Sequence, residues 1–400
     1  MYRILALTAS VVLVTPPVRA ADGPLIAGMD ELRYTPPKEK GRADLVPGKV
    51  GRAVRFVFEK DARGAFFTTP IRGTTEWDKA AGFSFWVKGD GGDHTAGLEF
   101  IYDDDYSVRY DFAFPVKGTE WTKLVVAWDD LVPVLPGPKS RPLGGPGGNS
   151  PSRLAGPWFG KWWYWGDYPA VSFSVDELRL EPAIERDANR YTPDGPPLAR
   201  VLARLKAGKP LSVVTMGDSL TDTRHWANRE VSWPNLLRDR LKAGYGSVVT
   251  VHNSAIGGTQ LRQNLVLIPR WSDKVPEPDL VTICFGGNDW EGGMRGEQFR
   301  QTCADAVDRV RRATKGKADV LLMTTVPSAD QWLTRAELGE AASAAARERK
   351  AGLADTEKAF QAAGADNRAG LFVRDRVHLS PAGHAVVADA VVAAIEAAGR

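Results

Sequence analysis

The hydrophobic period of the chain changes near residue 186, and this change constrains the fold more than any other feature. Before it, short runs rich in Val, Phe, Tyr and Trp alternate apolar with polar residues, and clusters of Gly, Asp or Pro separate them. That pattern is typical of antiparallel strands. The runs cover residues 53–59, 82–88, 98–102, 107–114, 123–128 and 170–180. We therefore predict an all-β sandwich over residues 21–185.

Beyond the polar, turn-rich stretch 186–197, short apolar strands alternate with longer segments of helical period. The strands fall near 211–216, 248–252, 280–285 and 320–326, and the helices near 232–243, 297–314, 336–350 and 381–398. This order predicts a mostly parallel sheet with helices on both faces over residues 210–400, joined to the sandwich by a linker and helix at 186–209. Reactive groups of such sheets gather at the carboxyl ends of the strands.

Length and charge limit what such a chain can do. Four hundred residues favour two domains over one. Lys and Arg number 52 against 49 Asp and Glu, and no basic run stands out, so nucleic acid is not expected as a partner. No later apolar run reaches the about 18 residues that a membrane span needs.

The first twenty residues resemble a secretory signal peptide. A positive start precedes the apolar run Ile4–Val14, and the segment closes with a small residue at Ala20. We predict cleavage after residue 20 and export to the periplasm or the medium.

The two cysteines, Cys284 and Cys303, are too few for a disulfide scaffold. Two buried free thiols are the preferred interpretation, and one disulfide between them is the alternative.

Four polar motifs stand out in the second half, and three of them follow predicted strands. Gly217-Asp218-Ser219 leaves the first strand, and a serine there needs a base within hydrogen-bond reach to become a nucleophile. Asn253-Ser254-Ala255-Ile256-Gly257-Gly258 ends the second strand, where glycine exposes its N–H. Gly286-Gly287-Asn288-Asp289 ends the third, and an asparagine amide can donate to an oxyanion. Taken singly, each of these motifs is better explained as an ordinary turn.

The fourth motif, Asp375-Arg376-Val377-His378, precedes the last helix, which Ser380 and Pro381 begin. Asp375 can accept from one ring nitrogen of His378 and leave the other to take the serine proton. Asp222 and His225 repeat the spacing a few residues after Ser219. Because a base should approach from a different strand end, we interpret His225 as a wall of the pocket.

As a set, GDS, NSAIGG, GGND and DxxH resemble the SGNH hydrolase superfamily, the GDSL-type esterases, over about residues 210–400. The resemblance implies a flavodoxin-like three-layer fold, an ester hydrolase and no cofactor. It implies Ser219 as nucleophile, His378 as base and Asp375 as the residue that orients it. It places the oxyanion hole at the N–H groups of Ser219 and Gly258 and the side chain of Asn288. An acidic residue often follows the glycine of the second motif, whereas this chain has Thr259, which puts the tether of that loop in doubt.

The first half holds eight of the thirteen tryptophans, four of them within residues 158–165. The endings of its strands resemble those of galactose-binding-like jelly rolls, the fold of many carbohydrate-binding modules. Exposed rings could stack on sugars, whereas buried rings would form the sandwich core and the seam with the second domain. Candidate substrate contacts are Trp158, Trp162, Trp163, Trp165, His225 and Trp290.

Asp103, Asp104 and Asp105 suggest a solvated hairpin turn rather than a calcium site, and no metal is expected elsewhere.

From the motifs, the aromatic sandwich and the signal peptide together, we predict an exported serine esterase that removes acyl groups, in particular acetyl groups, from a polysaccharide. A lipid-directed esterase or lysophospholipase is the first alternative. A non-catalytic carbohydrate-binding protein is the second.

Overall fold

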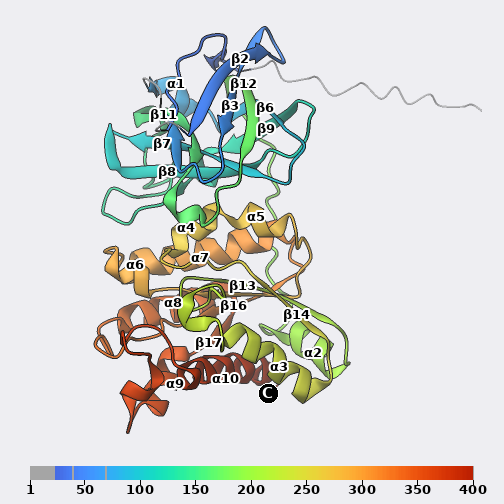
Figure 1. The fold of residues 1–400 in the computed structure, drawn as a ribbon, viewed down its shortest axis with the longest axis vertical. Coiled ribbons are helices and arrows are strands. Elements are labelled where there is room, and N and C mark those ends of the chain that lie inside the picture. Colours follow the sequence, from blue (N-terminus) through green and yellow to red (C-terminus); the bar gives the residue numbers. More distant parts are fainter. Residues whose placement is uncertain (1–22, 38–39, 68–69, 400) are drawn as a thin grey trace, which may run out of the picture.

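The computed structural model describes residues 23–37, 40–67 and 70–399. The predicted signal peptide at residues 1–20 lies outside these. A β-rich part and an α/β part follow one another along the longest axis of the molecule (Figure 1). Within the described ranges, no helix is both long enough and apolar enough to cross a membrane.

The β-rich part consists of two antiparallel sheets. The first has the order β2-β3-β12-β6-β9, with β1 pairing to β12, and the second has the order β10-β8-β7-β11-β4, with β5 pairing to β11. The first contains β1 (Leu25–Ala27), β2 (Gly41–Pro47), β3 (Arg52–Phe58), β6 (Gly82–Gly89), β9 (Thr122–Ala127) and β12 (Val171–Glu181). The second contains β4 (Gly64–Phe66), β5 (Ile71–Arg72), β7 (Thr95–Tyr102), β8 (Asp105–Pro115), β10 (Val132–Pro133) and β11 (Leu154–Lys161). Helix α1 (Thr75–Lys79) lies between β5 and β6.

Aromatic rings from both sheets meet in the core of this part. Phe56 of β3 stacks on Phe159 of β11 at 5.0 Å between ring centres, and Phe85 of β6 meets Phe114 of β8 edge-on at 5.2 Å. All four rings are fully buried. The antiparallel sheets expected from the alternating pattern are thus present, whereas the galactose-binding-like jelly roll stays a prediction.

The second part is built on five parallel strands in the order β14-β13-β15-β16-β17. They are β13 (Leu211–Gly217), β14 (Val249–Asn253), β15 (Leu280–Cys284), β16 (Asp319–Met323) and β17 (Gly352–Ala354). Helices α2 (Ala199–Lys206), α3 (Trp233–Tyr245), α9 (Thr356–Ala363) and α10 (Pro381–Ala397) cover one face. Helices α4 (Leu261–Val266), α5 (Ile268–Ser272), α7 (Gly296–Ala313) and α8 (Ala336–Arg349) cover the other. The predicted parallel sheet between two helical layers is confirmed.

Both faces of this sheet are apolar, so neighbouring residues of a strand pack into different cores. Val213 of β13 belongs to the cluster under α10, and Val214 belongs to the cluster under α7. The two cysteines lie on opposite sides of the sheet, since Cys284 of β15 packs on the α10 side and Cys303 belongs to α7 on the other side. Both are buried free thiols, as preferred from the sequence.

The outer face of the second β-sheet packs directly on α4, α5 and α7, and its apolar residues join the core of the α/β part in one continuous cluster. Arg262 of α4 lies in this seam with only 5% of its surface exposed. Its guanidinium donates to the carbonyls of Pro133, Leu135 and Ser140 at 3.2 to 3.3 Å. Because an arginine can satisfy several buried acceptors at once, it links the two parts without leaving polar groups unpaired.

Three of the four clustered tryptophans belong to this seam rather than to an exposed platform. Trp158, Trp162 and Trp165 are 2%, 7% and 1% exposed and pack in the cluster shared with α4 and α5. A buried ring presents no face to a sugar, so the structure removes these three from the candidate stacking residues. Trp163 is 55% exposed and remains available.

The aspartates that follow β7 form a turn. Asp103 and Asp104 both have positive φ, at 55° and 56°, and pair with Arg153 and Arg72. No group of three or more His, Cys, Asp or Glu side chains is poised to hold a metal in the described part of the chain.

A buried carboxyl pair lies on the seam side of the second sheet. Glu99 and Asp111 are cross-strand partners in β7 and β8, 2% and 0% exposed, and Tyr164 donates to Asp111. Burial raises the pKa of Asp111 to about 7. Burial, followed by the charge of Asp111, also raises the pKa of Glu99 well above its usual range. Arg109 lies at the edge of the pair, with its nearest nitrogen 4.0 Å from Glu99.

We expect this pair to make the protein less stable as pH rises. A carboxyl whose pKa is higher in the folded than in the unfolded chain stabilises the fold below the unfolded value of about 4, and this contribution is lost as pH rises to about 7. Asp111→Asn keeps an acceptor for Tyr164 but cannot ionise. Urea unfolding at pH 5 and pH 8 should therefore show a smaller loss of unfolding free energy for the variant than for wild type. Equal losses would contradict the assignment.

Candidate active site

The turn after β13 presents Ser219. The carbonyl of Asp218 accepts from the N–H groups of Thr221 and Asp222 at 3.0 and 2.9 Å, which closes a tight turn around the serine. A Cβ added at Gly217 would lie 2.3 Å from Thr221 Oγ1, so the sharp exit from the strand requires glycine. Ser219 is partly exposed between buried neighbours, which leaves its hydroxyl open to a substrate.

Ser219, His378 and Asp375 form one hydrogen-bonded chain. His378 Nε2 lies 3.0 Å from Ser219 Oγ, and His378 Nδ1 lies 2.7 Å from Asp375 Oδ2. The other oxygen of Asp375 accepts from the backbone N–H groups of Val377 and His378. Burial raises the pKa of Asp375, but the hydrogen bonds from His378 and the backbone outweigh it, so the pKa lies below its usual value. An ionised Asp375 holds the Nδ1 proton and leaves Nε2 free to accept the serine proton.

The loop that carries His378 is fixed at both ends. Arg376 has φ +64° and forms an ion pair with Asp330 at 2.6 Å. The carbonyl of His378 accepts from Val373 N–H at 2.8 Å. Ser380 Oγ accepts from Gly383 N–H and caps α10, as its position before Pro381 predicts. These contacts hold the imidazole over Ser219 without contribution from a ligand.

The hydrogen bonds of the backbone favour Gly258 over Gly257 as a donor for the oxyanion hole. The N–H of Gly257 donates to Asp222 Oδ2 at 3.2 Å. The N–H of Gly258 has no partner in the described part of the chain, and this residue is exposed with φ +77°. The N–H of Ser219 is likewise without a partner among the described residues. These two groups are therefore the backbone donors still available to an oxyanion.

Thr259 tethers the glycine loop in place of an acidic residue. Its Oγ1 donates to the carbonyl of Ile256 at 2.6 Å and accepts from Asn264 Nδ2 at 2.7 Å. Its own carbonyl accepts from Asn288 Nδ2 at 3.0 Å. The threonine thus connects the second motif to α4 and to the third motif, and the loop is not left without support.

The side chain of Asn288 lies between the second and first motifs. Besides Thr259, its Nδ2 approaches Asp218 Oδ2 at 3.4 Å, a long contact that an oxyanion can replace. Asp289 fixes the backbone here, because its carboxylate accepts from the N–H groups of Leu261 and Gly286 at 3.0 and 3.1 Å. Burial raises the pKa of Asp289 to about 7 and that of Asp218 to about 6.

We expect Asn288→Ala to lower kcat by about 10²–10³-fold, because an oxyanion donor acts on the transition state more than on the bound substrate. KM should change little. Steady-state kinetics on a small activated acetate ester measure both constants. A variant in which KM rises and kcat is unchanged would make Asn288 a ground-state binding residue.

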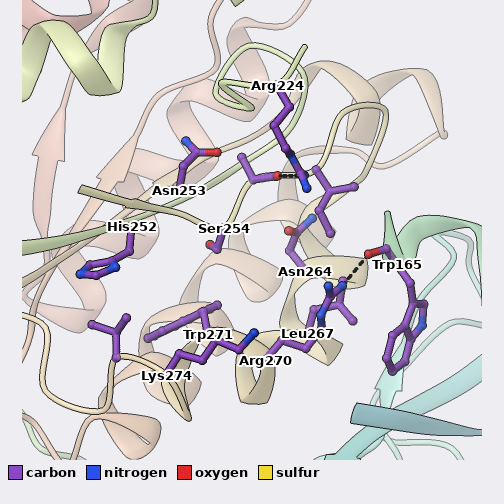
Figure 2. A pocket seen from close by; sticks show the side chains of 13 residues that line it. Trp165, Arg224, His252, Asn253, Ser254, Asn264, Leu267, Arg270, Trp271 and Lys274 are labelled. Carbon is purple, nitrogen blue, oxygen red and sulfur yellow. Dashed lines mark hydrogen bonds between the residues drawn. The ribbon is translucent and has the colours of Figure 1, made fainter. Parts of the chain in front are cut away.

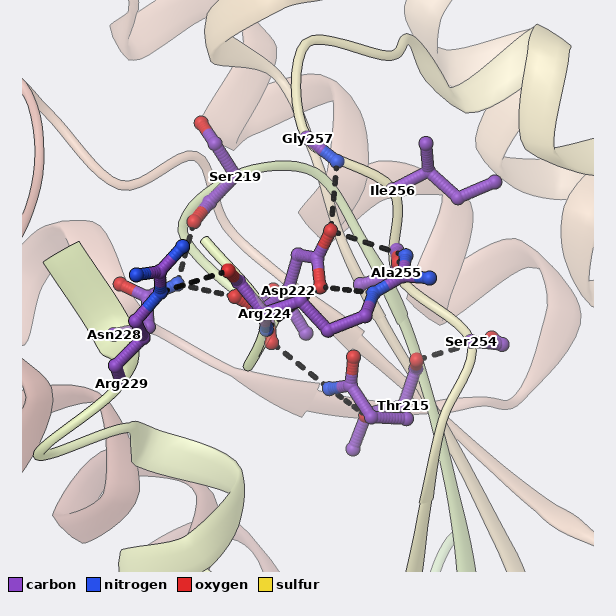
Figure 3. A network of polar contacts seen from close by, with 12 residues as sticks. Thr215, Ser219, Asp222, Arg224, Asn228, Arg229, Ser254, Ala255, Ile256 and Gly257 are labelled. Carbon is purple, nitrogen blue, oxygen red and sulfur yellow. Dashed lines mark hydrogen bonds and ion pairs between the residues drawn. The ribbon is translucent and has the colours of Figure 1, made fainter. Parts of the chain in front are cut away.

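Under the serine lies a polar network that the sequence did not reveal (Figure 3). Asn228 Nδ2 donates to the carbonyls of Ser219 and Asp222 at 2.6 and 2.8 Å. Asp222 accepts from Gly257 N–H and from Arg224, whose other arm donates to the carbonyl of Ala255 at 3.0 Å. The network ties the nucleophile turn to the glycine loop, so the two halves of the oxyanion hole are placed together.

His384 completes this network from α10. Its Nδ1 accepts from Trp233 N–H at 3.2 Å and its Nε2 lies 3.1 Å from Asn228 Oδ1. The backbone donor fixes the proton on Nε2, which then donates to Asn228. Burial lowers the pKa of His384 to about 4, so this ring is neutral at pH 7. No sequence motif singles out His384, because it is one histidine on a helix and its partner, Asn228, lies 156 residues earlier in the chain.

The remaining predicted contact residues fall in different places. His225 stacks on His378 with ring centres 4.3 Å apart, which places it beside the base as a wall. Trp290 is partly buried, and Arg295 covers its ring at 3.8 Å. Trp226, which the sequence did not single out, is 54% exposed and meets the ring of His378 at 5.7 Å.

Residues 215–386 match the model of the family described as GDSL-like Lipase/Acylhydrolase. This segment is a GDSL-like acylhydrolase domain. It includes Ser219, Asn288, Asp375 and His378, so the expected resemblance is confirmed for the second half of the chain. The family implies hydrolysis of an ester. The sandwich lies outside the matched residues.

Solved structures similar to this chain cover just under half of it. One is an acetylxylan esterase from Geobacillus stearothermophilus, with 24% identity over 48% of this chain and 96% of that one, at a TM-score of 0.40. Another is an alpha/beta hydrolase enzyme from the metagenome of Lake Arreo, Spain, with 23% identity over 46% and 95%, at a TM-score of 0.39. A comparison with curated proteins gives no match.

Proposed function

We propose that this protein is an exported serine esterase that removes acetyl groups from a polysaccharide. The observation that carries the proposal is the chain Ser219–His378–Asp375, with contacts of 3.0 and 2.7 Å, which opens beside an exposed tryptophan. Export rests on the signal-like first twenty residues alone.

The geometry supports an acyl-enzyme mechanism. Ser219 Oγ attacks the ester carbonyl while His378 Nε2 takes its proton, and the carbonyl oxygen becomes an oxyanion. In this mechanism the oxyanion accepts from the N–H groups of Ser219 and Gly258 and from the amide of Asn288. His378 returns the proton to the departing sugar oxygen. Water, deprotonated by His378, then attacks the acetyl-serine and releases acetate.

Two observations support a short acyl group on a sugar. The backbone of Gly257 passes close to the nucleophile, since a Cβ added there would lie 3.6 Å from both Ser219 Cβ and His225 Cδ2. We take this close approach to favour a short acyl group. Trp226 presents a half-exposed indole next to His378, where an aromatic face suits the apolar face of a sugar ring.

An acyl-length panel tests the proposal. Activated esters from acetate to decanoate are assayed together with acetylated xylo-oligosaccharides. The proposal predicts the highest kcat/KM for acetate, a fall beyond butyrate and release of acetate from the oligosaccharide. Activity that rises with chain length would instead identify a lipid-directed esterase. No turnover of any ester together with glycan binding would identify a non-catalytic carbohydrate-binding protein.

A further inference from the structure

A cavity of about 350 Å³ lies where the β-rich part meets the α/β part (Figure 2). Trp165 enters its wall from the sandwich, and every other lining residue comes from the α/β part. The turn after Trp165 is close-fitting, because a Cβ added at Gly166 would lie 3.0 Å from Ile256 of the glycine loop. Cavities of about 300–1,000 Å³ at domain boundaries are typical binding sites for small groups.

The lining of this cavity carries positive charge. It includes Arg224, Arg270 and Lys274 and no carboxylate. Arg224 pairs with Asp222, and Arg270 pairs with Asp167, both outside the lining. Each arginine uses only part of its donor set in these pairs. The cavity can therefore accept a negatively charged group without displacing its own ion pairs.

Lys274 is the least satisfied of the three cations. Its Nζ lies 3.6 Å from Asp93 Oδ2, whereas Lys117 Nζ contacts the other oxygen of that carboxylate at 2.6 Å. The side chain of Lys274 is 62% exposed, and its contact with Asp93 is the longer of the two that this carboxylate makes with Lys274 and Lys117. It is thus free to turn toward an anion in the cavity.

The remaining walls suit a ring rather than a simple ion. The apolar part of the lining comes from Leu267, Val275, Trp165 and Trp271. The two tryptophans are only 1% and 7% exposed, so they bound the cavity without presenting an open face for stacking. Apolar walls combined with cations favour a ligand that has an apolar face and a carboxylate. Among glycan units, a uronic acid has both.

The cavity is also continuous with the catalytic loop. Ile256 lines it, and the next residue, Gly257, lies beside Ser219. Arg224 lines it as well and holds the carbonyl of Ala255 in the same loop. A glycan whose ester reaches Ser219 can therefore pass over this loop and place a neighbouring unit in the cavity.

We propose that this cavity is a subsite for the carboxylate of a uronic-acid unit in the glycan that the enzyme deacetylates. The inference rests on the proposed function for the identity of the chain that enters the site. Its charge recognition is carried by Arg224, Arg270 and Lys274.

Calorimetric titration of the full chain carrying Ser219→Ala tests the subsite. The probes are unacetylated xylo-oligosaccharides of equal length, one with a glucuronate branch and one neutral. We expect the charged probe to bind about tenfold more tightly, and this preference to shrink at high salt. Adding Lys274→Gln should remove most of the preference. Lys209→Gln, an exposed lysine next to the opposite end of β13, should leave it unchanged.

Equal affinity for the two probes would overturn the subsite, as would displacement of the charged probe by inorganic phosphate at the same concentration. The titration needs no turnover, so it separates the subsite from the proposed function. Hydrolysis of acetyl esters without a preference for the charged probe contradicts the subsite alone. Preference for the charged probe without any ester hydrolysis contradicts the function alone.

Discussion

Ser219→Ala is expected to abolish ester hydrolysis while the fold is retained. In serine hydrolases, loss of the nucleophile lowers kcat by about 10⁶-fold. Here the hydroxyl is 3.0 Å from His378 and is partly exposed, so its removal deletes the attacking atom and leaves no buried cavity. Steady-state assays with an activated acetate ester measure the loss.

Ser343→Ala is the matched control, because Ser343 Oγ only donates to the carbonyl of Gly339 within α8. Both variants should show the circular dichroism and melting temperature of wild type. Undiminished turnover by Ser219→Ala would overturn the assignment of the nucleophile.

His378→Ala should reduce kcat almost as severely as loss of the serine, whereas Asp375→Asn should cost about 10⁴-fold. The difference follows from their positions. His378 Nε2 receives the proton, while Asp375 contacts only Nδ1 and the backbone of the loop. Kinetics of the two variants under identical conditions measure the order of the effects.

His225→Ala is the control for this pair, because His225 has the same spacing from an aspartate and stacks on His378. Its loss should be far smaller than that of His378. If His225→Ala were the more severe variant, the roles of the two histidines would have to be exchanged.

The sequence predicted the α/β part well because its signals are local. Four of the five strands of the parallel sheet are short apolar runs in the sequence, and three of the polar motifs follow such runs directly. The carboxyl ends of neighbouring parallel strands then bring Ser219 and Asn288 to one edge of the sheet. The placement of His378 against Asp375 depends on their separation by three residues and on the helix cap at Ser380. Both are local features that can be recognised in the sequence.

The parts that could not be predicted depend on contacts between distant segments. Asn228 and His384 bond across 156 residues, and neither lies in a recognisable motif. The Trp-rich segment was ambiguous for a related reason. Strand alternation predicts that Trp158 and Phe159 face opposite sides of β11, but only the packed structure shows that one side is the sandwich core and the other the seam.

Covalent trapping shows directly whether Ser219 is the nucleophile of an acyl-enzyme reaction. The protein is incubated with a phosphonate ester, which leaves a stable tetrahedral adduct on a nucleophilic serine, and the modified peptide is located by mass spectrometry. We expect one adduct, on Ser219, which is absent from Ser219→Ala and forms much more slowly in His378→Ala. An adduct on another residue, or ester hydrolysis with no adduct, would contradict it.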